Sequence, residues 1–142
     1  MEKVLVIVSG YFNPVHKGHI EYLKRSKALG DFLYVIVNND YQRELKGSKP
    51  FMVADERKLI IESFKFVDKA MVAVDTEKTV NESIKFIVNE IGSQFNKIIF
   101  ANGGDQNRNT VGETQLCKEL GIELADGLGD KIQSSSWLLN KL

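Results

Sequence analysis

Short apolar runs alternate along the chain with longer segments of helical periodicity. The runs occupy residues 4–8, 32–37, 69–74, 97–101 and 122–125. They are rich in β-branched residues, as are strands buried on both faces of a parallel sheet. The pattern therefore predicts five strands.

Apolar positions three and four residues apart predict helices between and after these strands. Ile84, Ile87, Val88 and Ile91, for example, fall on one helical face. Asp75, Thr76 and Thr79 offer capping groups for that helix, Asp55 lies near the N-cap of another, and Ser134 to Ser136 open the last. Four helices are expected over residues 20–29, 54–66, 110–120 and 137–142. Another, capped by Asp75, Thr76 or Thr79, is expected to end at about residue 91.

Glycines and polar stretches mark the breaks between these elements. Gly30 is expected at the C′ position of the first helix. Gly121 is expected to end the helix over residues 110–120. Residues 41–50 are polar and basic and are expected to form a loop that could include a short helical piece. Residues 126–130 are expected to form a glycine-rich loop.

The alternation of strands and helices predicts an α/β fold: a single-domain, Rossmann-like, doubly wound parallel sheet of five strands over residues 1–142. Open sheets of this kind bind ligands beyond the carboxyl ends of their strands, at the point where the strand order reverses. Polar segments follow the first, fourth and fifth predicted strands. We therefore look for the functional site in these three segments.

Composition narrows the function without identifying it. With 19 basic and 19 acidic residues the formal net charge is zero, which argues against a nucleic-acid-binding surface. Cys117 is the single cysteine, so no intramolecular disulfide or zinc-ligand cluster is expected. No apolar segment approaches the roughly 20 residues of a membrane span, and no signal peptide is evident. We expect a cytoplasmic protein without nucleic-acid or membrane partners.

The two histidines of the chain, His16 and His19, both follow the first predicted strand. Three residues apart at a helix start, they face the same side, and Gly18 leaves the backbone between them open. The helix N-terminus adds N–H groups that favour anions, so the pattern indicates a phosphate site. Incidental histidines are one alternative. A metal site is another, weakened by the lack of a third nearby ligand.

The segment from Gly10 to His19 resembles the Gly-x-Phe-Asp/Asn-x-x-His-x-Gly-His signature of the cytidylyltransferase-like nucleotidyltransferases. The resemblance continues over most of the chain. It includes residues 46–50 with Glu56-Arg57, residues 67–72, the turn at 102–105, and Gln133-Ser134-Ser135-Ser136 near the end.

The resemblance implies the activity and the roles of the site residues. His16, His19 and Lys46 would be catalytic, with Lys46 reaching the α-phosphate or the acceptor phosphate. Arg57 would hold a substrate phosphate or form a salt bridge. A nucleoside triphosphate, CTP or ATP with Mg²⁺, is expected, and so is a homodimer. The expected nucleotide-binding residues are Gly10, Tyr11, Phe12, Asn13, Gly18, Asn102, Gly103, Gly104, Asp105, Ser134, Ser135 and Ser136.

Two departures from the family pattern leave the nucleotide open between CTP and ATP. Asn13 replaces the aspartate common in cytidylyltransferases, and an arginine that often lies before the serines is replaced by Gly129. The resemblance implies transfer of CMP or AMP to the phosphate of a small phosphorylated alcohol or sugar, with release of pyrophosphate. An adenylyltransferase acting on a cofactor precursor and a catalytically silent nucleotide-binding regulator are the alternatives.

Overall fold

The computed structural model describes residues 2–12, 16–47, 52–103 and 111–128. All five predicted strands are present and form one parallel sheet in the order β3-β2-β1-β4-β5. β1 is therefore central, and the chain leaves it first toward β2 and β3 and later toward β4 and β5. The strands are β1 (Val4–Gly10), β2 (Phe32–Val37), β3 (Lys69–Val72), β4 (Lys97–Gly103) and β5 (Glu123–Leu128).

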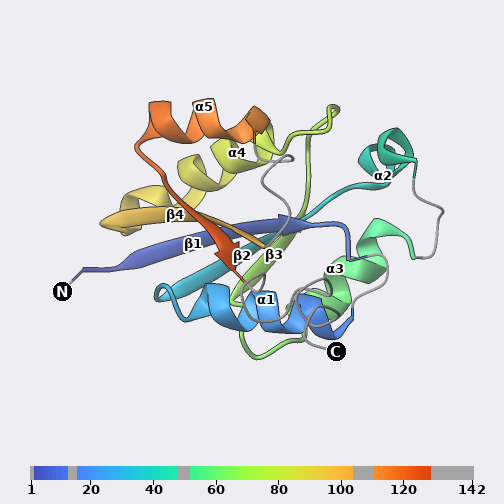
Figure 1. The fold of residues 1–142 in the computed structure, drawn as a ribbon, viewed down its shortest axis with the longest axis horizontal. Helices are drawn as coiled ribbons and strands as arrows, with labels where there is room; N and C mark the ends of the chain where they lie inside the picture. The colour runs from blue at the N-terminus through green and yellow to red at the C-terminus, as the bar shows by residue number, and fades with distance from the viewer. Residues whose placement is uncertain (1, 13–15, 48–51, 104–110, 129–142) are drawn as a thin grey trace, which may run out of the picture.

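Helices cover both faces of the sheet (Figure 1). α4 and α5 lie on one face, α1 and α3 lie on the other, and α2 stands beyond the carboxyl ends of the strands. This is the doubly wound arrangement that the sequence predicts. The helices are α1 (Lys17–Lys27), α2 (Asp40–Lys46), α3 (Ala54–Glu62), α4 (Asn81–Ile91), followed by the short 3₁₀ helix η1 (Gly92–Gln94), and α5 (Val111–Leu120).

The alternation of side chains along β1 supplies two hydrophobic cores, one on each face of the sheet. Leu5 and Ile7 pack in the core beneath α4 and α5. Val4, Val6 and Val8 pack in the core beneath α1 and α3. Because every apolar position of this strand is buried, β1 forms the rigid base from which the following turn projects.

Several element ends differ from the sequence prediction because strand pairing or helix capping decides them. β4 extends to Gly103 and β5 to Leu128, since these two residues are paired partners beyond a register shift. The expected loop at 126–130 therefore begins as a strand. β3 ends at Val72 and α3 at Glu62, both earlier than predicted. The predicted helix at 137–142 lies outside the described residues.

The polar stretch expected as a loop contains a full helix, α2. Asn39 caps it by accepting the Gln42 N–H, and Gln42 reaches back to the Asn39 N–H at 3.0 Å. Gly47, at φ +85°, closes it. Capping at both ends explains why so short and polar a segment is helical.

Gly30 has a different role from the one predicted. α1 ends earlier, with Ala28 as its C-cap, so Gly30 lies one position beyond C′. A Cβ at Gly30 would stand 2.8 Å from the carbonyl oxygen of Val4. The glycine is therefore required for close packing against β1. Gly121, at φ +72°, ends α5 as expected.

Two other capping predictions also have definite outcomes. The Asp75 carboxylate accepts the N–H groups of Glu82 and Ser83 and thereby caps α4 from a distance, which confirms its predicted role. At α3 the N-cap is Val53, with no side-chain cap, so Asp55 does not cap that helix.

Candidate active site

The turn after β1 leads directly into α1, and His16 and His19 form a capping box there. His16 is the N-cap, and its Nδ1 accepts the Gly18 N–H at 3.1 Å. The His16 N–H in turn donates to Nδ1 of His19 at 3.1 Å. Both Nδ1 atoms are acceptors, so each neutral ring carries its proton on Nε2. The pair therefore has two Nε2–H donors to offer a ligand.

The two imidazole rings stack with their centroids 3.9 Å apart and their planes at 29°. Gly18 makes this possible, since a Cβ there would lie 3.0 Å from Cε1 of His16. The first turn of α1 contains no acidic residue to oppose an anion. The positive end of the helix and the histidine donors are thus arranged on one anion-binding corner.

Burial, together with the nearby His16 and Lys46, lowers the pKa of His19 to about 4. The ring is half-buried and edge-on to Phe12, with centroids 5.0 Å apart. His19 is consequently neutral at physiological pH. In this neutral form Nδ1 accepts the His16 N–H and Nε2–H can donate one hydrogen bond.

Phe12 holds the turn in a conformation that few side chains adopt. Its φ is +50°, and its ring is only 1% exposed. A Cβ at Gly10 would lie 2.7 Å from Cζ of that ring, so the glycine is required for the ring to tuck beneath the turn. Phe12 contributes to the site by supporting His19 rather than by offering its ring to a ligand.

Lys46 comes to the same corner from the last turn of α2. Its Nζ lies 4.3 Å from the centroid of the Tyr11 ring, a cation–π distance. The Tyr11 hydroxyl donates to the carbonyl oxygen of Gln42 at 3.5 Å, which ties the turn to α2. Lys46 is exposed, and its charge is near enough to lower the pKa of His19.

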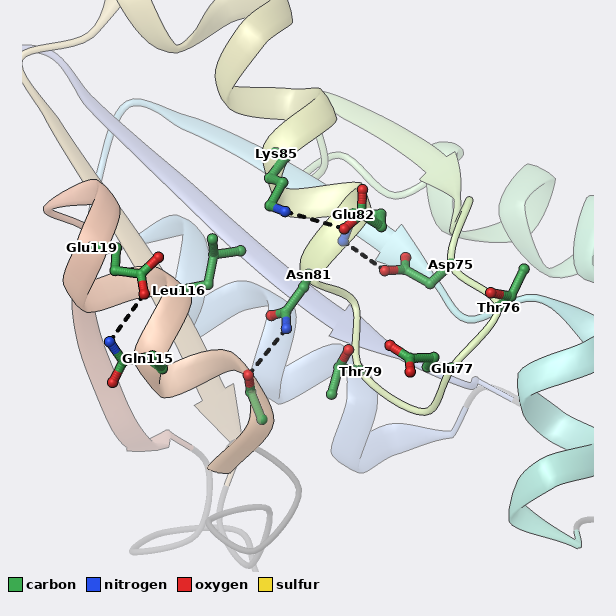
Figure 2. Close-up of a pocket in the computed structure, with 11 residues that line it drawn as sticks. Asp75, Thr76, Glu77, Thr79, Asn81, Glu82, Lys85, Gln115, Leu116 and Glu119 are labelled. Atoms are coloured by element: carbon green, nitrogen blue, oxygen red, sulfur yellow. Dashed lines mark hydrogen bonds and ion pairs between the residues drawn. The ribbon is translucent and has the colours of Figure 1, made fainter.

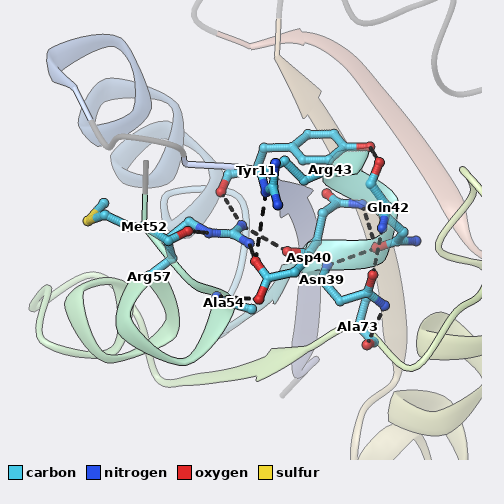
Figure 3. A network of polar contacts seen from close by, with 10 residues as sticks. Tyr11, Asn39, Asp40, Gln42, Arg43, Met52, Ala54, Arg57 and Ala73 are labelled. Carbon is cyan, nitrogen blue, oxygen red and sulfur yellow. Dashed lines mark hydrogen bonds and ion pairs between the residues drawn. The ribbon is translucent and has the colours of Figure 1, made fainter. Parts of the chain in front are cut away.

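Arg57 is enclosed beneath the site (Figure 3). Its Nη1 donates to the carbonyl oxygens of Tyr11 at 2.6 Å and Asn38 at 2.8 Å. Nη2 forms an ion pair with Asp40 at 2.9 Å, and Nε donates to the Met52 carbonyl at 3.0 Å. The sequence left two roles open for Arg57, a salt bridge and a contact with a substrate phosphate. The structure contains the salt bridge. The side chain is 0% exposed and therefore does not face a substrate phosphate. Arg57 positions the turn.

A polar network that sequence reasoning missed joins α2 to the loop before α4 (Figure 3). Asn39 donates to the carbonyls of Ala73 and Asp75. Gln42 is fully buried and donates to the carbonyls of Glu77 and Thr79. The signal was present as an Asn followed three residues later by Gln, which is a capping-box pattern.

A cavity of about 340 Å³ opens beside Lys46 at the carboxyl ends of the strands. Gly112 makes this region tight, since a Cβ there would lie 2.3 Å from Cγ2 of Thr79. The wall of the cavity also contains a buried acid, Glu113, which sequence reasoning did not single out. The cavity is lined by the turn after β1 (Ser9, Gly10, Tyr11), by Asn38 and Lys46, by Lys78, Thr79 and Val80 before α4, and by Gly112 and Glu113 at the start of α5.

A second hollow of about 270 Å³ lies between α4 and α5 (Figure 2). Several of its polar side chains have partners: Lys85 pairs with Glu82, and Gln115 donates to Glu119. Asn81 donates to the carbonyl of Gly112. It includes none of the residues predicted for the site.

Some predicted residues fall outside the described part of the chain. These are Asn13, Gly104, Asp105, Ser134, Ser135 and Ser136. Asn102 and Gly103 lie at the end of β4, not in the turn that was expected. β4 is parallel to β1, so its end reaches the same edge of the sheet as the histidine turn.

No three His, Cys, Asp or Glu side chains in the described ranges are grouped to hold a metal ion. A divalent cation such as Mg²⁺ keeps several waters and is commonly bound through substrate phosphates. The described donor set therefore does not fit a resident metal ion, and we derive no step through one.

The profile of the cytidylyltransferase-like family matches residues 7–124, which include the histidine corner and the cavity. The chain belongs to this family. Nucleotidyltransferases of this family use nucleoside triphosphates.

Curated relatives and a solved structure agree with the family assignment. An FAD synthase of Thermococcus sibiricus is 37% identical over 107 residues, which cover 75% of this chain and 66% of that protein. The bifunctional protein HldE of Wolinella succinogenes is 33% identical over 126 residues, or 87% of this chain but 24% of that protein. The lipopolysaccharide core biosynthesis protein of Thermoplasma volcanium has a TM-score of 0.67 at 29% identity, covering 88% and 94% of the two chains.

The chain thus spans less than two thirds of the length of both curated relatives. Among the helices that the structure describes, none is long and apolar enough to cross a membrane.

Proposed function

We propose that the nucleotidyltransferase transfers CMP or AMP from CTP or ATP to the phosphate of a small phosphorylated alcohol or sugar. A phosphate oxygen of the acceptor attacks the α-phosphorus of the nucleotide. The bond from that phosphorus to the α,β-bridging oxygen breaks, and pyrophosphate leaves. The observation that carries the proposal is the stacked pair His16 and His19 at a helix N-terminus, whose Nε2–H groups have no partner among the described residues.

The chain's own groups supply positioning and charge stabilisation, which are the main needs of such a transfer. In this proposal the His16 and His19 Nε2–H groups donate to the α-phosphate as its charge redistributes. Lys46, held beside Tyr11, neutralises the α-phosphate or the attacking phosphate. The remaining proposed nucleotide ligands are Gly10, Tyr11, Asn13, Gly18, Asn102, Gly103, Gly104, Asp105, Ser134, Ser135 and Ser136.

Mg²⁺ enters this proposal with the triphosphate, because the described residues offer no cluster of their own for it. We further propose that the protein works in the cytoplasm as a homodimer. Size-exclusion chromatography with light scattering tests the dimer. A single species at the monomer mass of 16.0 kDa would contradict it.

A second candidate is an adenylyltransferase that acts on a cofactor precursor. The 37% identity to an FAD synthase favours it, with a flavin mononucleotide as the acceptor. The resemblance to a lipopolysaccharide core biosynthesis protein favours the sugar phosphate instead. A catalytically silent regulator would retain nucleotide binding without either reaction.

One experiment separates these candidates. Pyrophosphate release is measured with CTP and with ATP, each in the presence of flavin mononucleotide or of a pool of polyol and sugar phosphates. Release only with the pool supports the first proposal. Release only with ATP and flavin mononucleotide supports the second. Tight nucleotide binding by calorimetry with no release in any mixture contradicts both and supports a regulator.

A further inference from the structure

Glu113 is a buried acid in the first turn of α5, on the wall of the 340 Å³ cavity. Its side chain is only 4% exposed. Oε2 accepts the N–H of Val80 at 2.9 Å. Oε1 is also buried, and within the described ranges it has no hydrogen-bond partner. An unpartnered buried carboxylate oxygen is uncommon, because its lost hydration is not replaced.

A purely structural role accounts for one oxygen of Glu113 and not for the other. The contact with Val80 ties α5 to the loop before α4. The nearby Asp75 supplies no donor, since both its oxygens accept from Glu82 and Ser83. Burial raises the pKa of Glu113, the Val80 N–H and its own N–H oppose this, and Asp75 raises it again. By hydrogen-bond geometry, Oε1 nevertheless has no donor among the described residues.

The charges around the cavity indicate what kind of molecule could supply that donor. Lys46 and Lys78 line the same cavity as Glu113. A bare phosphate suits the lysines and is repelled by the carboxylate, whereas a simple cation has the opposite preference. A molecule with a phosphate at one end and hydroxyl groups further along satisfies both. A volume of about 340 Å³ is within the range of small-molecule sites.

We propose that Oε1 of Glu113 accepts a hydrogen bond from a hydroxyl of the phosphorylated acceptor and thereby selects alcohol and sugar phosphates. The inference rests on the proposed function, whose acceptor phosphate would lie toward Lys46. It makes Glu113 a specificity-determining residue. Because a hydrogen bond to a charged group is strong, we expect about tenfold or greater preference for hydroxyl-bearing acceptors.

The test uses Glu113→Gln, which keeps an oxygen for the Val80 N–H and replaces the other oxygen with an NH₂ group. Glu119→Gln is the matched control, because it removes the same charge from the exposed side of the same helix. Calorimetry without nucleotide measures binding of glycerol 3-phosphate, ribitol 5-phosphate and mannose 1-phosphate. n-Propyl phosphate serves as the hydroxyl-free probe, and thermal unfolding reports whether the Val80 contact survives.

We expect at least one hydroxyl-bearing probe to bind the wild type about tenfold or more tightly than n-propyl phosphate. Glu113→Gln should lose most of that preference, and Glu119→Gln should keep it. An unchanged preference in Glu113→Gln, or equal weakening of every probe, would overturn the inference. Failure of all three hydroxyl-bearing probes to bind better than n-propyl phosphate would also overturn it.

Pyrophosphate release in the same samples separates this inference from the proposed function. Release with a sugar or polyol phosphate but no Glu113-dependent preference leaves the function standing and refutes the role of Glu113. A Glu113-dependent preference without any pyrophosphate release supports the binding role and refutes the transfer reaction.

Discussion

The Nδ1 atom of His19 accepts the backbone N–H of His16, so the two predicted catalytic residues are locked together by their own helix cap. The same arrangement directs each Nε2–H away from the backbone. Local helix-capping geometry thus prepares the donors before any ligand arrives. This relationship and the contacts that support it can be tested in five ways.

His19→Ala should lower kcat by about 100-fold or more, as does removal of a single donor that stabilises a transition state. The far-ultraviolet circular dichroism spectrum should stay that of the wild type, because His19 is half-buried at the edge of the core. Steady-state pyrophosphate release checks the rate. Turnover at the wild-type level would remove His19 from the catalytic residues.

His16→Asn separates helix capping from chemistry. Asn is a good N-cap and can accept the Gly18 N–H, so thermal stability should change little. It has no equivalent of Nε2–H at the same reach, and activity should fall by about tenfold or more. His16→Ala is the comparison, and it should lose both activity and about 1 kcal/mol of stability. Equal activity in His16→Asn and wild type would contradict a chemical role for His16.

The lowered pKa of His19 predicts a definite pH dependence. In the unfolded chain the histidine takes up a proton near pH 6.5, and in the folded chain only near pH 4. Unfolding therefore binds a proton in this interval, and stability should decrease as the pH falls from about 6.5 toward 4. NMR titration of the ring protons locates the midpoint. A midpoint for His19 near 6.5 would show that burial does not exclude its charged form.

Arg57→Met should destabilise the fold by about 3 kcal/mol or more, because it removes a fully buried charge that pairs with Asp40 and leaves the carbonyls of Tyr11 and Asn38 without this donor. Denaturant unfolding measures this change. Lys58→Met is the control, since its exposed pair with Glu62 contributes at most about 1 kcal/mol. If Arg57 instead held a substrate phosphate without supporting the fold, the variant would keep its stability and raise only KM.

Gly10→Ala should impair the site through Phe12. The new methyl group would meet the Phe12 ring at 2.7 Å, so the ring and the His19 edge against it must shift. We expect a loss of about 1–3 kcal/mol together with reduced kcat. Gly121→Ala is the control: it has open space but a positive φ, so it should lower stability and leave kcat unchanged. Normal activity in Gly10→Ala would contradict the proposed support of His19 by Phe12.

Much of the fold could be predicted because its signals are local. The apolar runs fixed where all five strands lie, and helical spacing located α1, α3, α4 and α5. Strand ends were less predictable, since Gly103 and Leu128 belong to strands only because they pair with each other. The segment of α2 was expected to be a loop that could include a short helical piece. The extent of the helix was missed because it depends on the caps at Asn39 and Gly47 more than on an apolar face.

The sequence by itself determined the positions of the five strands, the family signature and the proximity of His16 to His19, because all of these depend on residues close together in the chain. Tertiary structure alone decided the role of Arg57, whose acceptors come from Tyr11, Asn38 and Asp40. It also decided that Glu113 reaches the cavity beside Lys46. Such placements depend on which distant segments meet at the end of the sheet, and burial and charge acquire their meaning only there.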